Sequence, residues 1–263
     1  YKNSLIMSIK IASWNVNSIK ARLEHVKRWL AANPVGVLMI QELKGLEFPA
    51  EEFEKIGYKS KAVTQKAYNG VAILSKHDFE VIYTALPGDE TDEQSRYIEI
   101  EMNGVRIINI YLPNGNPVSA DSEKFSYKLR WMDRLYTRLK ELREDSVPFL
   151  IGGDFNVIPE EKDCANPKAW EGDALYHPET HKRWRALLNL GLIDAFRVYN
   201  QAAEQYTFWD YQRGAWQKND GIRIDHFLLS PAITDRLINC TIDKVPRGEE
   251  KASDHTPITL EIR

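Results

Sequence analysis

Phe149-Leu-Ile-Gly-Gly-Asp-Phe-Asn156 is the stretch from which the rest of the chain can be interpreted. An apolar run ends there in two glycines and is followed by Asp154 and Asn156, two residues apart. Because side chains alternate between the two faces of a strand, this spacing predicts a carboxylate and a carboxamide on one face. The glycines leave room for another backbone or a ligand to approach. A simple turn is the alternative, since Gly, Asp and Asn all favour turns.

The same pattern, an apolar run that ends in polar side chains, recurs along the chain. Strands are predicted over residues 9–14, 35–40, 71–74, 97–102, 105–112, 222–230 and 258–262, and the fourth and fifth of these form a hairpin. Six strand ends then supply Asn15, Glu42, Tyr111, Asp154 with Asn156, Asp225, and Asp254 with His255. One polar residue at a strand end is ordinary, whereas six predict a shared site if the fold brings them together.

Helical periodicity appears between these predicted strands. Helices are predicted between Ser18 and Asn33, over 51–55, over 125–142 with a basic outer face, and over 180–190. Residues 159–178 are predicted to be an irregular, functional loop that carries Trp170. Many strands with few long helices favour a mixed-sheet sandwich with helices on its outer faces over a purely parallel sheet. Without repeats or linkers, residues 9–263 are predicted to form one domain, after an N-terminal extension at 1–8.

Composition sets broad limits on function. The 263 residues carry a formal net charge of -3, so no overall basic field attracts a polyanion, although a local basic rim remains compatible with this sum. Only Cys164 and Cys240 are present, which argues against a disulfide framework and favours a cytoplasmic protein, although one disulfide is still compatible. No run approaches the roughly 18 apolar residues of a membrane span, so no membrane association is expected.

The chemistry of the six strand ends is rich in oxygen ligands. Carboxylates and carboxamides are typical ligands of Mg²⁺ or Mn²⁺, and no Cys/His spacing typical of zinc occurs. Such a set suits the hydrolysis of a phosphate ester, in which a cation neutralises charge and a carboxylate activates water. Taken alone, Glu42 is typical of a surface side chain and Tyr111 of a packed aromatic. Asp225 is harder to explain structurally because an acid inside a core strand is costly unless it is paired, whereas His226 faces the other side.

Seven motifs in a fixed order identify a family resemblance. They are Ser13-Trp-Asn-Val-Asn-Ser18, Gln41-Glu-Leu-Lys44, Asn69-Gly-Val-Ala-Ile73, Tyr111-Leu-Pro-Asn-Gly115, Gly153-Asp-Phe-Asn156, Arg223-Ile-Asp-His226 and Ser253-Asp-His-Thr-Pro257. Over nearly the whole chain the sequence resembles the exonuclease III family of apurinic/apyrimidinic endonucleases, in the endonuclease/exonuclease/phosphatase superfamily. The resemblance implies a four-layer α-β-β-α sandwich of two mixed sheets flanked by helices.

The resemblance also implies roles for the strand-end residues. Glu42 becomes the principal metal ligand and Asp154 the carboxylate that orients or deprotonates water. Tyr111 holds the phosphate, and Asp225 supports His255, which bonds a phosphoryl oxygen. The implied metal ligands are Asn15, Glu42, Asp154, Asn156, Asp254 and His255, and Asn156 also contacts the phosphate. Family members leave open whether one or two metals act and which residue is the base. The implied cofactor is Mg²⁺, with Mn²⁺ as the alternative.

The implied substrate is double-stranded DNA with abasic sites or 3' ends, cut by a monomeric DNA repair enzyme. Its activities would be 3'-5' exonuclease, 3'-end trimming and abasic-site incision. An extruded abasic sugar would contact the wall formed by Phe208, Trp209 and Ile222, since flipping favours a damaged nucleotide. Implied substrate contacts elsewhere are Asn17, Trp170 and the basic side chains Arg223, Lys124 and Lys128.

One loop departs from the family pattern. Well-known abasic-site endonucleases of the family carry small and amide residues where this chain has Asn166-Pro-Lys-Ala-Trp-Glu-Gly-Asp-Ala-Leu175. We expect Trp170 to narrow the pocket and to favour 3'-terminal trimming over internal abasic incision. Two rival functions share part of the pattern. The first is a phosphoesterase of the same superfamily that acts on a lipid, an inositol phosphate or RNA, and the second is a catalytically silent DNA-binding protein.

Overall fold

The computed structural model describes residues 7–263 and contains two six-stranded sheets. The first sheet has the order β13 (Leu237–Ile242), β14 (Ile258–Ile262), β1 (Ile9–Asn15), β2 (Val37–Gln41), β4 (Val71–Ser75) and β3 (Lys59–Val63). The second has the order β5 (Glu80–Tyr83), β6 (Tyr97–Met102), β7 (Val105–Tyr111), β8 (Phe149–Asp154), β12 (Asp225–Leu229) and β9 (Ile193–Asp194). A small ribbon pairs β10 (Phe208–Trp209) with β11 (Gly221–Ile222). Of the predicted extension at 1–8, residues 1–6 lie outside the described residues.

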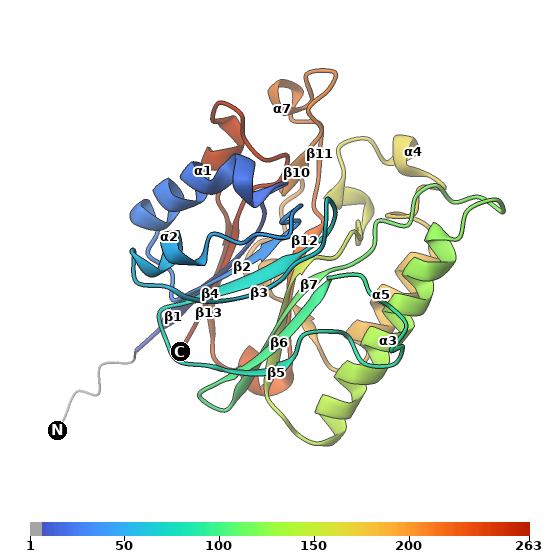
Figure 1. Ribbon diagram of the computed structural model, residues 1–263. Coiled ribbons are helices and arrows are strands. Elements are labelled where there is room, and N and C mark those ends of the chain that lie inside the picture. The colour runs from blue at the N-terminus through green and yellow to red at the C-terminus, as the bar shows by residue number, and fades with distance from the viewer. Residues whose placement is uncertain (1–6) are drawn as a thin grey trace.

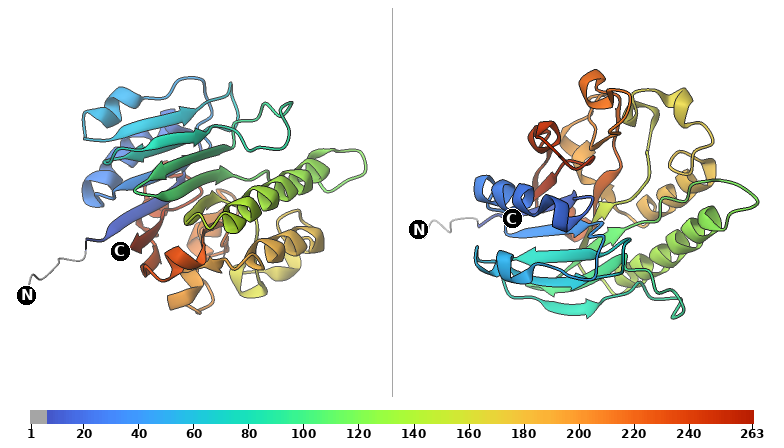
Figure 2. Two further views of the ribbon diagram at one scale, coloured as in Figure 1. Left: turned by 90° about the horizontal axis from the view of Figure 1, so that it is seen from below. Right: turned by 45° about the horizontal axis from the view of Figure 1, so that its top comes forward.

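Helices cover the outer faces of the two sheets (Figure 1). The helices are α1 (Ile19–Ala32), α2 (Ala50–Glu54), α3 (Lys124–Glu144), α4 (Pro167–Trp170), α5 (Pro178–Leu188), α6 (Ala195–Tyr199), α7 (Ala215–Lys218) and α8 (Pro231–Thr234), with 3₁₀ turns η1 (Glu161–Asp163) and η2 (Val245–Gly248). Helices α1 and α2 pack on the first sheet, and α3 and α5 pack on the second. The views in Figure 2 show the same succession of helix, sheet, sheet and helix. The predicted four-layer sandwich is therefore confirmed.

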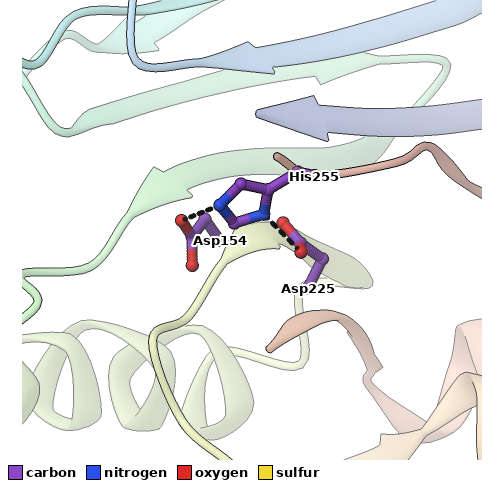
Figure 3. A group of neighbouring side chains, drawn as sticks. All are labelled: Asp154, Asp225 and His255. Atoms are coloured by element: carbon purple, nitrogen blue, oxygen red, sulfur yellow. Dashed lines mark hydrogen bonds and ion pairs between the residues drawn. The ribbon is translucent and has the colours of Figure 1, made fainter. Parts of the chain in front are cut away.

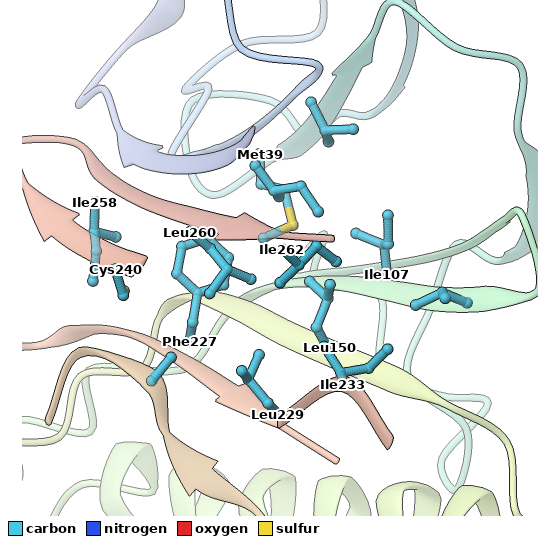
Figure 4. Close-up of a cluster of buried hydrophobic side chains, with 14 of the residues drawn as sticks. Met39, Ile107, Leu150, Phe227, Leu229, Ile233, Cys240, Ile258, Leu260 and Ile262 are labelled. Atoms are coloured by element: carbon cyan, nitrogen blue, oxygen red, sulfur yellow. The ribbon is translucent and has the colours of Figure 1, made fainter. Parts of the chain in front are cut away.

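The main core lies between the two sheets (Figure 4). Met39 and Leu260 of the first sheet face Leu150 and Phe227 of the second, and all four side chains are fully buried. Gly152 belongs to this contact because a Cβ there would lie 2.5 Å from the Phe227 ring. The glycines of the opening stretch thus allow close packing, as the sequence predicts.

Most predicted elements are present, and the differences have local causes. Helix α1 begins after Ser18, whose side chain accepts a hydrogen bond from the Ala21 N–H, and it ends at Asn33. The continuous strand predicted over 222–230 is wrong, because the chain leaves the small ribbon at Ile222 and enters the second sheet only at Asp225. Strands β3, β5 and β13 were not predicted, since their polar and apolar residues give only weak alternation.

The sheet topology gathers the polar strand ends at one edge of the sandwich. Strands β7 and β8 run parallel with Tyr111 opposite Asp154, and β1 and β2 run parallel with Asn15 opposite Gln41. Strand β12 runs antiparallel to β8, so its first residue, Asp225, also lies opposite Asp154. Strand β14 runs antiparallel to β1, which brings the segment before Ile258 to the same edge.

Candidate active site

The gathered strand ends line a pocket with a volume of about 330 Å³. The predicted site residues in its wall are Glu42, Tyr111, Asp154, Asn156, Trp170, Phe208, Ile222, Asp254 and His255. A larger hollow of about 700 Å³ lies elsewhere on the first sheet, beside Lys10, His77 and Asp243. It contains none of the predicted site residues, so the smaller pocket is the candidate active site.

The pocket contains a His255 imidazole held between two buried carboxylates (Figure 3). Its Nδ1 lies 2.8 Å from Oδ2 of Asp225, and its Nε2 lies 3.5 Å from Oδ2 of Asp154. Burial opposes the charge of the imidazole, but Asp225 and Asp154 outweigh it and raise the pKa of His255 well above its usual value. Oδ1 of Asp225 has no hydrogen-bond partner among the described residues, so this buried acid is paired through His255 alone. A buried acid was expected to need a partner, and the partner of Asp225 is His255.

Asp154 is fixed in place by the end of β1 and by the segment that follows its own strand. Its Oδ2 accepts a hydrogen bond from Nδ2 of Asn15 at 3.0 Å, and its Oδ1 accepts one from the Asn156 N–H at 3.0 Å. Nδ2 of Asn156 in turn donates to the Leu112 carbonyl at 2.8 Å. Burial, with the Asp225 charge in addition, raises the pKa of Asp154, which suits a carboxylate that takes a proton.

Glu42 also lines the pocket and shares the Asn15 carboxamide with Asp154. Its Oε1 accepts hydrogen bonds from the Tyr111 hydroxyl at 2.8 Å and from Nδ2 of Asn15 at 3.3 Å, and its Oε2 lies 3.2 Å from Nζ of Lys44. Burial and the charges of Glu42 and Asp154 raise the pKa of Tyr111 well above its usual value. The phenol therefore stays protonated, and its single O–H is donated to Glu42.

Arg96 is a site neighbour that sequence reasoning missed. Its guanidinium lies 4.9 Å from the centre of the Tyr111 ring and donates to the Tyr111 carbonyl at 3.0 Å. The sequence signal for Arg96 was its position. It comes one residue before β6, the strand predicted to form a hairpin with β7, which ends at Tyr111. Such a contact fixes the ring of Tyr111 through a cation–π interaction.

The donor set fits a hard divalent cation. Glu42 and Asp254 face one pocket, and burial followed by repulsion from Glu42 raises the pKa of Asp254. A divalent cation beside these carboxylates would offset this repulsion. Asp154, Asp225 and His255 also have ligand atoms within 4.8 Å of one another. Because both ring nitrogens of His255 already face carboxylates, that trio is better suited to holding a proton than a metal.

Three predicted substrate contacts are wrong because the side chains are buried. Arg223 forms ion pairs with Asp163 and Asp194, each at 2.7 Å, and is 1% exposed. Trp209 is fully buried and donates its indole N–H to Asn219, so it supports the loop behind the wall. The third, Lys128, lies beneath the pocket with no exposed surface.

The remaining predicted contacts lie at or near the pocket surface. The Phe208 ring packs against the His255 ring with centroids 5.1 Å apart, and Ile222 and Trp170 complete the apolar wall. Asn17 lies outside the pocket lining, where its side chain bonds Lys44 and Tyr211. Lys124 is exposed at the start of α3. His226 is buried, and burial followed by repulsion from Arg223 lowers its pKa to about 4, in agreement with the structural role predicted for it.

Comparisons with known proteins agree over most of the chain. Residues 12–255 match the endonuclease/exonuclease/phosphatase family. The chain is 33% identical to exodeoxyribonuclease III of Haemophilus influenzae, with 97% of this chain and all of the relative covered. It is 37% identical to the structure of a 3'-5' exonuclease (NExo) from Neisseria meningitidis, with a TM-score of 0.92 and coverage of 97% and 99%. An AP endonuclease from Archaeoglobus fulgidus superposes with a TM-score of 0.89 at 36% identity, with coverage of 96% and 98%.

Proposed function

Because this chain belongs to the endonuclease/exonuclease/phosphatase family, in its exonuclease III branch, we propose that it is a divalent-metal-dependent DNA repair nuclease. The observation that carries this proposal is the meeting of Asp154, His255 and Glu42 in one pocket. The proposed substrate is double-stranded DNA with 3' ends or abasic sites. Lipid, inositol phosphate and RNA substrates are not favoured, since relatives that match nearly the full length are named as DNA nucleases.

In the proposed reaction, Asp154 takes a proton from the attacking water, and its fixed carboxylate orients that water toward phosphorus. His255, charged because of its two carboxylate neighbours, donates a hydrogen bond to a phosphoryl oxygen, and Asp225 holds the ring in place. The neutral Tyr111 hydroxyl, which donates to Glu42 in this structure, would turn to the phosphate when substrate binds, and with the Asn156 side chain it would stabilise the developing negative charge. A bound divalent cation would neutralise charge on the phosphate and assist departure of the leaving oxygen, and Glu42, Asn15 and Asp254 would hold it.

We propose Mg²⁺ as the physiological cation, with Mn²⁺ as a functional substitute, because the donors are oxygen atoms. The two unpaired cysteines, Cys164 and Cys240, are compatible with the reducing cytoplasm predicted from the sequence. Among the described residues no helix is both long enough and apolar enough to span a membrane.

Glu42→Ala is expected to raise the Mg²⁺ concentration needed for half-maximal activity by about tenfold to a hundredfold, the range typical when metal coordination is weakened. The substitution removes the acceptor of the Tyr111 hydroxyl and one of the carboxylates that line the pocket. The measurement is a Mg²⁺ titration of cleavage by metal-stripped protein. Glu47→Ala, which removes an exposed carboxylate from the following loop, is the control. An unchanged Mg²⁺ requirement in Glu42→Ala would remove Glu42 from the metal site.

The substrate profile follows from Trp170. Its side chain lines both the active-site pocket and a neighbouring hollow of about 390 Å³. Phe208 and Ile222 also line both cavities, so these three side chains form the wall between them. We expect Mg²⁺-loaded protein to remove 3'-phosphate and 3'-phosphoglycolate groups faster than it incises an internal abasic site. Initial rates on the matched substrates, with blunt 3' ends and with Mn²⁺ in parallel, measure this preference.

The matched variant for this experiment is Trp170→Gly. If the indole narrows the pocket, the variant should gain internal abasic incision relative to 3'-end trimming. Equal rates of the two reactions in the unmodified protein would contradict the narrowing. Failure to cleave any of the DNA substrates with either cation would contradict the proposed function itself.

A further inference from the structure

Lys128 has an environment that is unusual for a lysine. It lies on α3, and no part of its side chain is exposed. Its ammonium donates to three backbone carbonyls, those of Asn114 at 3.1 Å, Asn156 at 2.6 Å and Ala174 at 3.2 Å. A lysine ammonium has three N–H donors, so every donor is used and none remains for a ligand.

The three carbonyls belong to three separate segments of the pocket wall. Asn114 follows β7, which carries Tyr111, and Asn156 follows β8, which carries Asp154. Ala174 follows the turn that contains Trp170. These acceptors lie 14, 28 and 46 residues from Lys128, so one ammonium connects parts of the site that are distant in sequence.

A short chain of hydrogen bonds runs from Lys128 to the carboxylate proposed to activate water. Asn156 has a φ of 48°, in the left-handed region that few side chains favour. In this conformation its carbonyl accepts from Lys128 while its N–H donates to Oδ1 of Asp154. Without the ammonium, the carbonyl would lose its buried donor, and the cost of leaving it unsatisfied would favour another backbone conformation.

The stem of Lys128 is packed as tightly as its head group. A Cβ added to Gly115 would lie 2.6 Å from Cδ of Lys128 and 3.1 Å from Cβ of Ala174. Burial lowers the pKa of Lys128 to about 7, and the charges of Asp173 and Asp154 oppose this shift. The side chain thus fills the space between the loops and also supplies their hydrogen bonds.

We propose that Lys128 is a positioning residue, whose ammonium joins the loops at Asn114, Asn156 and Ala174 and thereby sets the orientation of Asp154 in the pocket. The expected effect on kcat rests on the proposed nuclease function. The expected effect on the loop structure does not. It predicts that Lys128 acts on the chemical step and not on the affinity for DNA, because no surface of it is exposed to substrate.

The test replaces the ammonium with an apolar side chain of similar length, Lys128→Met. The control is Lys140→Met on the same helix, where the lysine is exposed and lies 3.9 Å from Glu144. Cleavage of a 3'-recessed duplex should show kcat reduced by at least about tenfold in Lys128→Met, with KM changed by less than about threefold. Hydrogen exchange should accelerate at the amides of Asn156 and Ala174, whose side-chain acceptors lie in these loops, and should stay unchanged in α1.

Each outcome has a distinct meaning. If kcat and the exchange of these two amides match those of Lys140→Met, the positioning role is wrong. If exchange accelerates locally but neither the variant nor the unmodified protein cleaves DNA, the positioning role stands and the proposed function fails. If Lys128→Met does not fold, Lys128→Arg decides, because it keeps the charge and supplies donors in a changed geometry. Faster exchange at the amides of Asn156 and Ala174 together with a reduced kcat in Lys128→Arg supports the positioning role. Unchanged exchange and unchanged kcat contradict it.

Discussion

Asp154→Asn is expected to lower the rate of DNA cleavage by about a thousandfold, within the range that general acid–base groups contribute. The amide has nearly the shape of the carboxylate, so it can stay in the pocket opposite Asn15 and His255. It cannot accept a proton from water, and its neutral charge no longer favours the imidazolium form of His255. Single-turnover cleavage of a 3'-recessed duplex at saturating Mg²⁺ measures the effect.

A measurement of DNA binding distinguishes loss of the proton acceptor from misfolding of Asp154→Asn. The dissociation constant for the same duplex should stay within about threefold of the unmodified value, because the buried Asp154 contributes little surface to a DNA contact. Asp78→Asn is the control, since this carboxylate is exposed and outside the pocket. Cleavage by Asp154→Asn at more than a tenth of the unmodified rate would exclude Asp154 as the main base.

Arg223→Met is expected to lower the free energy of unfolding by about 3–5 kcal/mol, as is typical when one partner of a buried ion pair is removed. The guanidinium pairs with Asp163 and Asp194 and also lies 3.1 Å from Nδ1 of His226. Without it, Arg197 is the ion-pair partner that Asp163 keeps among residues 7–263. A loss of this size is a large part of the roughly 5–15 kcal/mol that stabilises a typical domain. Urea unfolding at 25 °C measures it.

The same substitution should have a characteristic pH dependence. Burial acts to raise the pKa of Asp163, but Arg223 and Arg197 outweigh it and hold the pKa below the ordinary value of 3.8. A lowered pKa stabilises the fold above the ordinary value, and this contribution is lost as the pH falls through the folded value. The difference between the unmodified protein and Arg223→Met should therefore shrink as the pH falls below about 4, where the unfolded chain takes up this proton first, and should be lost once the pH falls through the lowered pKa of Asp163 in the folded protein.

The control for the stability measurement is Arg185→Met on α5, which removes an exposed arginine. Its effect should stay within about 0.5 kcal/mol, as is usual for surface substitutions. If Arg223→Met lost less than about 1 kcal/mol at neutral pH, the buried pairs would not be the stabilising element inferred here.

Much of the fold could be predicted from the sequence because its signals are local. Short apolar runs, alternating in β1 and continuous in β8, and the hairpin signal before β7 gave these strands, and the stripe of Leu135, Leu139 and Leu142 gave α3. The break between Ile222 and Asp225 was not predictable in the same way. Both halves are apolar enough for a strand, and only the pairing partners place them in different sheets.

Lys128 shows a signal that could have been used. It lies on the same helical face as Leu135 and Leu139, seven and eleven residues before them, so helical spacing places it with the buried stripe. Its charge led to the opposite prediction of a surface contact. Arg223 carried no comparable signal, because its partners, Asp163 and Asp194, lie 60 and 29 residues away.

The sequence by itself determined that a buried apolar run leads into Asp154, that Asp225 needs a partner, and that the other strand ends carry oxygen ligands. These conclusions follow from spacing and from the cost of burying a charge, which depend on a few neighbouring residues. The expectation that Asp154 and Asn156 share one strand face is wrong, because the strand ends at Asp154 and Asn156 has a φ of 48°. Only the tertiary structure decided that His255 is the partner of Asp225, that Glu42 and Asp254 line one pocket, and that Lys128 and Arg223 are buried. Burial and pairing depend on which distant segments meet, and that is set by the register and direction of strands across two sheets.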